Sequence, residues 1–130
     1  MLRSLLLAAL VTTPALAITV ANPASDQIKA YPDIQRRAVL RGIVMDGGAY
    51  CKRVEQAAFQ GPWGNLAMWR AKCHPTDKRL DYAVFIGADA TAQVRPCTDM
   101  AYLKLPACRP FAPPRASLSP ARPAKASRSR

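Results

Sequence analysis

The residue types that most enzymes use are scarce in this sequence. Its 130 residues include a single histidine, His74, and no Cys-x-x-Cys pair of the kind that redox sites use. Between residues 18 and 108 the only serine is Ser25. A hydrolase needs a nucleophile, a base and a group that orients the base, and the sequence offers no such combination. A calcium-binding D-x-[DN]-x-[DN]-G loop is missing as well. We therefore predict a protein that is not an enzyme and that holds neither a cofactor nor a metal ion.

Carboxylates are the remaining candidates for chemistry, and three of them, Asp77, Asp81 and Asp89, fall on or beside predicted turns. In such positions an aspartate side chain usually accepts hydrogen bonds from nearby backbone amides and stabilises the turn. Asp77 and Asp81 could instead act as a catalytic carboxylate pair, but nothing in the sequence indicates the burial that would shift their pKa values. We expect the turn-stabilising role.

Acidic residues are absent from the last 22 residues, 109–130, which contain five prolines and six lysines or arginines. A segment of this composition buries too little apolar surface to offset the entropy of ordering, so we expect a disordered, basic tail. Two roles are open for the tail: contact with an anionic surface, or solvation without a partner. The candidate contact residues are Arg115, Arg122, Lys125, Arg128 and Arg130.

The net charge of +11 does not indicate a nucleic-acid-binding domain, because the tail supplies six of these charges and Arg3 supplies one more. Residues 18–108 hold twelve basic and eight acidic residues, an excess of only four. We therefore expect no nucleic acid partner.

Long apolar runs are also missing, apart from Leu5 to Val11 near the N-terminus. This run follows Arg3 and precedes Ala15-x-Ala17, which is the order of a secretory signal peptide cleaved after Ala17. A membrane anchor is the alternative, but the run is too short for a hydrocarbon core of about 30 Å. The sequence predicts a signal peptide at 1–17, a periplasmic or secreted mature chain, and no transmembrane segment within that mature chain.

Four cysteines are present, and in a short exported chain an even number indicates disulfides. The turn-like composition of 60–64 predicts an antiparallel hairpin centred on Pro62. In that hairpin the first two cysteines lie directly opposite each other, because each is eleven residues from Pro62. The predicted disulfides are Cys51–Cys73 and Cys97–Cys108.

A zinc site is the main alternative use of the cysteines, with Cys73 and His74 as ligands. The ligand spacings match no familiar zinc module. Neighbouring residues of a strand also point to opposite faces of a sheet, which makes these two an awkward pair of ligands for one ion. Disulfides remain the prediction.

The predicted helices flank the strand-forming region. Asp33 is a candidate N-cap for an amphipathic helix that stops at Gly47-Gly48. A shorter turn or helix is expected within 22–31. After the strands, Thr98 is a candidate N-cap for a short final helix that ends at Lys104.

Between these helices, apolar and polar residues alternate as in half-buried strands. Strands are predicted over 66–73, 82–86 and 92–94, and the hairpin adds one before them. We predict an α+β domain over 18–108, in which the amphipathic N-terminal helix packs on an antiparallel meander of three to four strands, with disulfides and a short C-terminal helix. The expected core is Ile34, Val39, Leu40 and Ile43 from the helix, with Trp69, Ala71, Tyr82, Val84, Ile86 and Val94 from the strands.

The cysteines and the alternating strand residues form one pattern: Trp69-x-x-x-Cys73, then Tyr82-x-Val84-x-Ile86-x-x-Asp89-x-x-x-x-Val94-x-x-Cys97. In this pattern the chain resembles small exported proteins of alphaproteobacteria. The resemblance covers residues 47–108 and leaves out the basic tail. It implies an exported, disulfide-bonded domain, and it implies no activity and no catalytic residue.

Two functions follow from these features. The first is a non-catalytic exported domain that binds, or is accessory to, an envelope macromolecule, with an envelope protein or an anionic envelope surface as partner. Trp63 at the tip of the predicted hairpin is its candidate anchor, because tryptophan is enriched at binding hot spots. This side chain could equally fold back onto its own sheet. The alternative function is a small periplasmic hydrolase or redox protein that uses His74 and a free cysteine.

Overall fold

The computed structural model describes residues 20–113. Two helices precede a four-stranded antiparallel sheet in which strands that are consecutive in sequence are neighbours in space. The predicted α+β class is therefore confirmed. The elements are α1 (Pro23–Ala30), α2 (Asp33–Asp46), β1 (Val54–Trp63), β2 (Leu66–Cys73), the short 3-10 helix η1 (Lys78–Leu80), β3 (Asp81–Ile86), β4 (Ala92–Pro96) and the 3-10 helix η2 (Cys97–Asp99).

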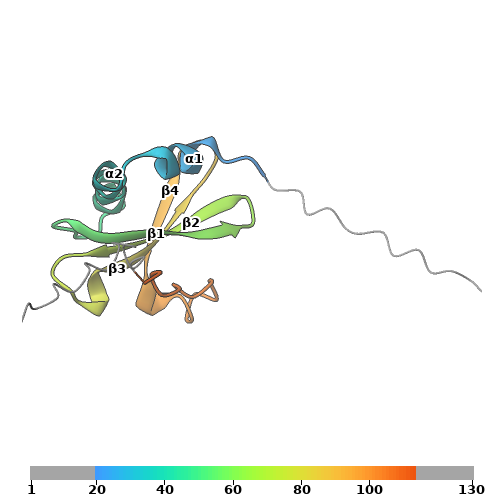
Figure 1. The fold of residues 1–130 in the computed structure, drawn as a ribbon. Helices are drawn as coiled ribbons and strands as arrows, with labels where there is room; N and C mark the ends of the chain where they lie inside the picture. The colour runs from blue at the N-terminus through green and yellow to red at the C-terminus, as the bar shows by residue number, and fades with distance from the viewer. Residues whose placement is uncertain (1–19, 114–130) are drawn as a thin grey trace, which may run out of the picture.

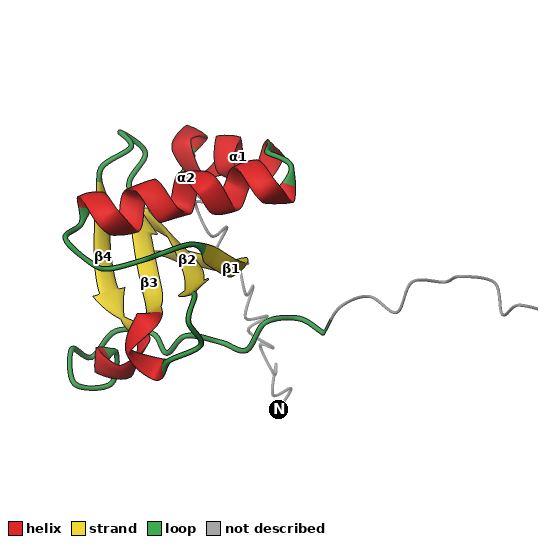
Figure 2. Ribbon diagram, turned by 90° about the vertical axis from the view of Figure 1, so that its left-hand side faces the viewer, coloured by secondary structure: helices red, strands yellow, loops and turns green. Residues whose placement is uncertain are grey.

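Both faces of the sheet are covered. The two helices lie on one side, which we call the helix face, and the chain after β4 crosses the other side, which we call the opposite face (Figure 1). The axis of α2 runs across the strands (Figure 2). The sheet is therefore the middle layer of the fold.

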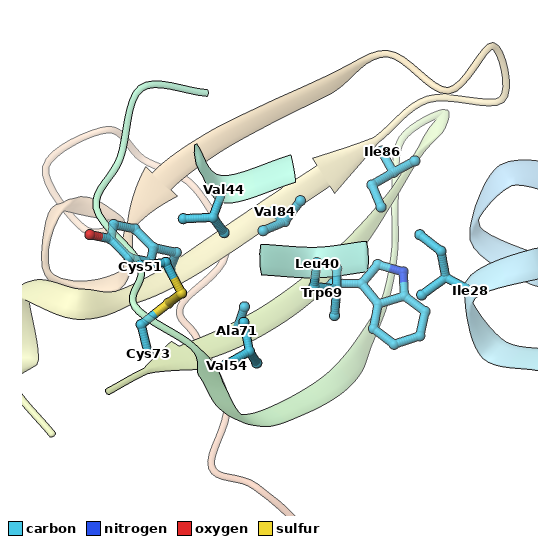
Figure 3. Packing of buried hydrophobic residues seen from close by; sticks show 11 residues of the cluster. Ile28, Leu40, Val44, Cys51, Val54, Trp69, Ala71, Cys73, Val84 and Ile86 are labelled. Atoms are coloured by element: carbon cyan, nitrogen blue, oxygen red, sulfur yellow. A yellow bond between two sulfur atoms is a disulfide. The ribbon is translucent and has the colours of Figure 1, made fainter. Parts of the chain in front are cut away.

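The main core lies between the helices and the helix face. Leu40 and Val44 of α2 are fully buried, and Ile28 of α1 is nearly so. The indole of Trp69 lies beside Ile28 (Figure 3). Val94, which was also expected in this core, is only half-buried. The buried sheet residues of the cluster are Val54, Trp69, Ala71, Cys73, Tyr82, Val84 and Ile86.

Hydrogen bonds from two polar residues fix α1 to the sheet. Asn22 caps the helix, because its Oδ1 accepts from the Ser25 backbone N–H at 3.0 Å, and its Nδ2 donates to the Ile86 carbonyl at 2.8 Å. Ser25 is 1% exposed, and its Oγ accepts from the Trp69 indole N–H at 2.9 Å. The sequence that starts the helix therefore also determines where the helix sits on the sheet.

Two arginines of α2 bind backbone carbonyl groups of neighbouring segments. Arg36 donates to the carbonyls of Ile28, Lys29 and Tyr31, at and just after the end of α1, at distances of 2.8 to 3.1 Å. The last carbonyls of a helix lack the usual partners within the helix, and Arg36 binds them here; the Ile28 carbonyl also accepts from the Tyr31 backbone N–H at 3.3 Å. Arg41 donates to the carbonyls of Cys51 and Lys52 at 3.1 and 2.8 Å. Both guanidinium groups thus connect α2 to the segments before and after it.

Two details of the predicted main helix are wrong. Ile34 is 77% exposed, because a residue six positions before Leu40 lies about 120° away around the helix. Asp33 is the first helical residue rather than the N-cap, and it forms an ion pair with Arg37 at 2.9 Å. Pro32 takes the N-cap position and makes no side-chain capping bond.

The β1–β2 hairpin turns later than the sequence predicted. β1 continues through Pro62 to Trp63, which pairs with Leu66, so the turn is Gly64-Asn65 and not 60–64. Gly64 has a φ of +58° and takes the first central position, where glycine is found in two-residue type II′ turns. Proline is tolerated within β1 because β1 is an edge strand of the sheet.

The hairpin register changes with the turn. Phe59 pairs with Trp69 and Val54 pairs with Cys73, with two β-bulges along β1. Each bulge uses one extra residue of the bulged strand. Cys51 therefore precedes the paired strand and approaches Cys73 from the loop before β1, with a Cα–Cα distance of 5.4 Å. The predicted disulfide partner is correct although the predicted register is wrong.

Both predicted disulfides, Cys51–Cys73 and Cys97–Cys108, are present. The first lies at the margin of the main core (Figure 3). Within residues 20–113 every cysteine is paired.

The opposite face carries a second, smaller core that the sequence analysis did not predict. Met68 of β2 and Phe85 of β3 pack against Met100, which is 1% exposed and comes from the chain after β4. All six residues of β3 are consequently buried. In place of the predicted final helix, the three-residue η2 is followed by turns up to Lys104, and Pro96 rather than Thr98 holds the N-cap position.

Contacts between the sheet and the last described residues extend past Cys108. The Arg109 backbone N–H donates to a glutamine side chain of β1 at 2.6 Å, and its carbonyl accepts from Arg70 at 2.7 Å. The Arg70 guanidinium also lies 4.2 Å from the centroid of the Phe111 ring and forms an ion pair with Asp81 at 2.6 Å. Arg70 thus joins β2, β3 and the C-terminal segment.

Candidate binding hollow

A hollow with a volume of about 670 Å³ lies between α1 and the turn end of the β1–β2 hairpin. We call it the α1 hollow. Its size is in the range of pockets that bind small ligands. Its walls come from residues 20–22 before α1, from Ser25, Asp26 and Lys29 of α1, and from Phe59, Pro62 and residues 64–67 of the hairpin.

The wall on the β1 side contains an exposed aromatic ring. Phe59 is 38% exposed, and its ring packs on Trp69 with the ring centroids 5.4 Å apart. Lys29 Nζ lies 3.8 Å from the centroid of the Phe59 ring and 3.5 Å from Asp26 Oδ1. The hollow therefore combines an apolar ring with a charge pair on the facing helix.

A second hollow of about 280 Å³ adjoins the first. It lies between the hairpin turn and the β3–β4 turn at 87–91, and it shares Val20, Asn65 and Leu66 with the α1 hollow. Both hollows are therefore at the turn end of the sheet, on the two sides of Val20, whose side chain is 56% exposed.

Trp63, the anchor predicted from the sequence, is not part of the α1 hollow. It is the last residue of β1 and is 41% exposed. Its ring packs against Phe85, with centroids 5.5 Å apart, and Phe85 belongs to the core of the opposite face. Trp63 thus folds onto its own sheet and keeps an exposed edge, and its role as a binding anchor stays a prediction.

His74 lies at the other end of the sheet. Its Nδ1 is 2.7 Å from Glu55 Oε1, and its side chain is 35% exposed. The hydrogen bond with His74 is the main reason that the pKa of Glu55 lies below its ordinary value. The adjacent Cys73 is in a disulfide and supplies no thiol. The pair connects β1 to the loop after β2.

Two of the three aspartates have the predicted turn-stabilising role. Asp77 accepts from the backbone N–H of Arg79 at 2.9 Å, and hydrogen bonds from the Arg79 side chain lower the pKa of Asp77 to about 2. Asp89 accepts from the Thr91 hydroxyl at 2.6 Å and backbone N–H at 3.1 Å, which also lowers its pKa. Asp81 differs, because it is a buried β3 residue whose carboxylate is paired with an arginine of β2.

Within residues 20–113, no three histidine, cysteine, aspartate or glutamate side chains are grouped so that they could hold a metal ion. The same part of the chain has no helix with both the length and the apolarity needed to cross a membrane. The predicted signal peptide at 1–17 falls outside the described residues. So do the predicted tail contacts, which are Arg115, Arg122, Lys125, Arg128 and Arg130.

The hollow itself was missed by sequence reasoning. With the turn placed at 60–64, Phe59 appeared to be next to a loop and received no role. With the turn at Gly64-Asn65, the same residue lies opposite Trp69 on the helix face, beneath Lys29. The glycine of a type II′ turn was the sequence signal that could have corrected the register.

Compared with protein-family models, curated proteins and solved structures, the chain shows no significant match. The function is therefore inferred from the geometry of this chain alone.

Proposed function

We propose that the protein is a non-catalytic, exported domain of the cell envelope that binds a macromolecular partner, and that the α1 hollow receives a protruding segment of that partner. The observation that carries the proposal is the hollow of about 670 Å³ with its exposed Phe59 ring. An aromatic side chain that a partner buries in a concave site contributes more binding energy than most other interface residues.

The walls of the hollow are held in place before any partner binds. Asn22 connects the start of α1 to β3, Ser25 bonds the Trp69 indole, and Phe59 packs on the same indole. A site that is already formed loses less conformational entropy on binding than one that must be ordered. This supports a recognition role for the hollow.

Export is supported by the two disulfides, which persist in oxidising compartments and are rare in reducing ones. The predicted signal peptide is in agreement with this. The alternative of a hydrolase or redox protein requires a free cysteine beside His74, and within the described chain each cysteine is in a disulfide.

Two matched tryptophan variants test the proposal. Asn65→Trp places an indole in the hollow from an exposed turn position, and Gln93→Trp places one at an exposed position of β4 that lines neither hollow. The mature chain and both variants are immobilised, and each is used to capture macromolecules from detergent-solubilised envelope extract.

We expect a macromolecule that the native chain and Gln93→Trp retain and that Asn65→Trp loses. Retention that Asn65→Trp leaves unchanged would contradict the hollow as the site. A third variant, Trp63→Ala, removes the exposed ring of the opposite face. Loss of retention in this variant alone would place the contact on that face and would also overturn the proposal.

A further inference from the structure

The charged residues are distributed unequally between the two ends of the sheet. Because all neighbouring strands are antiparallel, β1 and β3 begin, and β2 and β4 end, at the same end of the sheet. The turn end holds the connections 64–65 and 87–91, and Asp89 is the only charged residue within these two connections. The one other charge there is the Lys29–Asp26 pair of the α1 hollow. The two ends of β2 are roughly 25 Å apart, at about 3.3 Å per residue.

The end away from the turns is rich in cations, and we call it the basic end. Two basic residues precede β1, one is near the end of β2, two belong to η1 and one is near the end of β4. Four of these cations are therefore in the segments before β1 and between β2 and β3, and two are in the last residues of strands. The residues are Lys52, Arg53, Lys72, Lys78, Arg79 and Arg95.

Four of these six cations have no acidic partner within the described chain. Arg53 pairs with Glu55, and Arg79 pairs with Asp77. The remaining acidic residues that form ion pairs bind Lys29, Arg37, Arg70 or His74. The cations left without an acidic partner are Lys52, Lys72, Lys78 and Arg95.

Exposed tyrosine and leucine side chains accompany these cations. Tyr50 precedes the basic loop before β1 and is 62% exposed. Tyr102 and Leu103, which are 88% and 40% exposed, lie in the turn after η2, and η2 lies against η1 of the basic end. Tyrosine is enriched at the level of lipid headgroups, and lysine can bury its alkyl chain there while its ammonium group stays in water.

We infer that the basic end of the folded domain docks on an anionic lipid surface, so that the turn end and its two hollows face away from the lipid. Each lysine or arginine near such a surface strengthens the attraction to anionic lipid by about fivefold. The mixture of cations with exposed tyrosine and leucine fits a lipid interface better than a purely polyanionic partner. The inference is independent of the proposed function of the α1 hollow, because it concerns the other end of the molecule.

Vesicle binding by the full mature chain tests the inference. The test variant is Lys52→Gln, Lys72→Gln, Lys78→Gln and Arg95→Gln. The control is Gln27→Glu, Gln35→Glu, Ala88→Glu and Gln93→Glu, which lowers the net charge by the same amount at exposed positions outside the basic end. Both keep the basic tail, so their difference reports on the folded domain alone.

Partition is measured by sedimentation with vesicles of phosphatidylglycerol and phosphatidylcholine, and with vesicles of phosphatidylcholine only. We expect the test variant to bind the anionic vesicles at least tenfold more weakly than the native chain, and the control to stay within about threefold of it. Equal losses in the two variants would show a net-charge effect and overturn the inference. Native binding that is equal for both vesicle types would overturn it as well.

Heparin, a soluble polyanion, separates lipid docking from general anion binding. Tyr102→Ser with Leu103→Ser should weaken binding to anionic vesicles and leave heparin binding unchanged. The lipid assignment is wrong if the Tyr102→Ser, Leu103→Ser variant binds both anionic vesicles and heparin as the native chain does. It is also wrong if the variant of the four basic residues loses heparin binding and keeps vesicle binding. Thermal unfolding of every variant establishes that the fold is retained.

Discussion

At the scale of single residues, arginine side chains connect several segments of this small domain through hydrogen bonds and an ion pair. Arg36 and Arg41 bind backbone carbonyls, and Arg70 binds a carboxylate, a carbonyl and an aromatic ring. The planar guanidinium group suits such multiple contacts, which a lysine ammonium could not reproduce. These guanidinium groups are therefore part of the hydrogen-bond network that connects the helices, the sheet and the C-terminal segment.

Replacement of Arg70 should be the most damaging of these changes. Arg70 and Asp81 are 15% and 12% exposed, so Arg70→Met leaves a largely buried carboxylate without its partner and should cost roughly 3 kcal/mol of unfolding free energy. Urea denaturation measures the change. The double variant Arg70→Met, Asp81→Leu removes both charges and should recover much of the loss. A single variant as stable as the native protein would show that the ion pair is not structurally important.

The pH dependence of stability should contain a contribution from Asp77. Its pKa is about 2 in the folded protein and 3.8 ordinarily. A lowered folded-state pKa stabilises the fold above the unfolded pKa, and this stabilisation is lost as the pH falls from about 4 toward 2. Asp77→Asn should therefore melt at a lower temperature than the native chain at pH 6, and the difference should vanish near pH 2. Thermal unfolding monitored by circular dichroism measures it; a difference that is constant with pH would contradict the ion-pair explanation.

At the scale of elements, the chain after β4 is part of the fold rather than an appendage to it. It supplies Met100 to the second core, it is closed by Cys97–Cys108, and it continues to Phe111 through contacts with Arg70. The sheet would otherwise expose Met68 and Phe85 to solvent. The disulfide and the arginine contacts thus keep a short irregular segment against an apolar face.

Two truncations should distinguish the packed part of this segment from the rest of the tail. A chain that ends at Pro113 keeps all contacts of Arg109 and Phe111 and should melt within about 1 °C of the mature protein. A chain that ends at Cys108 loses two hydrogen bonds and the cation–π contact, and should melt several degrees lower, because about 1 kcal/mol shifts the midpoint of a small domain by roughly 4–8 °C. Equal melting temperatures for the two truncations would show that residues 109–113 add no stability.

Much of the sheet could be predicted from sequence because alternation is a local signal. Leu66–Cys73 was predicted with its observed bounds, and the residues of β3 that face the helices follow the same period. The hairpin turn was misplaced because Gly-Pro composition suggests a turn, while an edge strand accommodates proline without loss of a ladder bond. The bulges that let Cys51 reach Cys73 depend on tertiary contacts and leave no local signal.

The second core had a sequence signal that was read only in part. Tyr82, Val84 and Ile86 were assigned to one face, but Ala83 and Phe85 between them are apolar too. A continuous apolar run indicates a strand buried on both faces. The α1 hollow depends on the arrangement of α1 over the hairpin, set by Asn22 and Ser25, and this arrangement could not be read from spacing alone.

At the scale of the whole molecule, the two ends of the sheet differ in chemistry. The turn end contains both hollows, and its charges are Asp89 and the Lys29–Asp26 ion pair, while the basic end contains the unpaired lysines and an arginine. The antiparallel meander separates these features. The β1–β2 and β3–β4 turns lie at one end of the sheet, and the starts of β1 and β3 and the ends of β2 and β4 lie at the other. If the basic end docks on lipid as inferred, the α1 hollow is directed toward partners in the surrounding compartment.

Site-specific photo-crosslinking in intact cells tests the binding role of the turn end most directly. A benzophenone amino acid replaces Asn65, at the rim of both hollows, or Gln93, on β4 outside them. We predict a discrete cross-linked product from position 65 that is absent from position 93 and that disappears when Phe59→Ala is added. Identical products from the two positions, or none from position 65, would contradict the account.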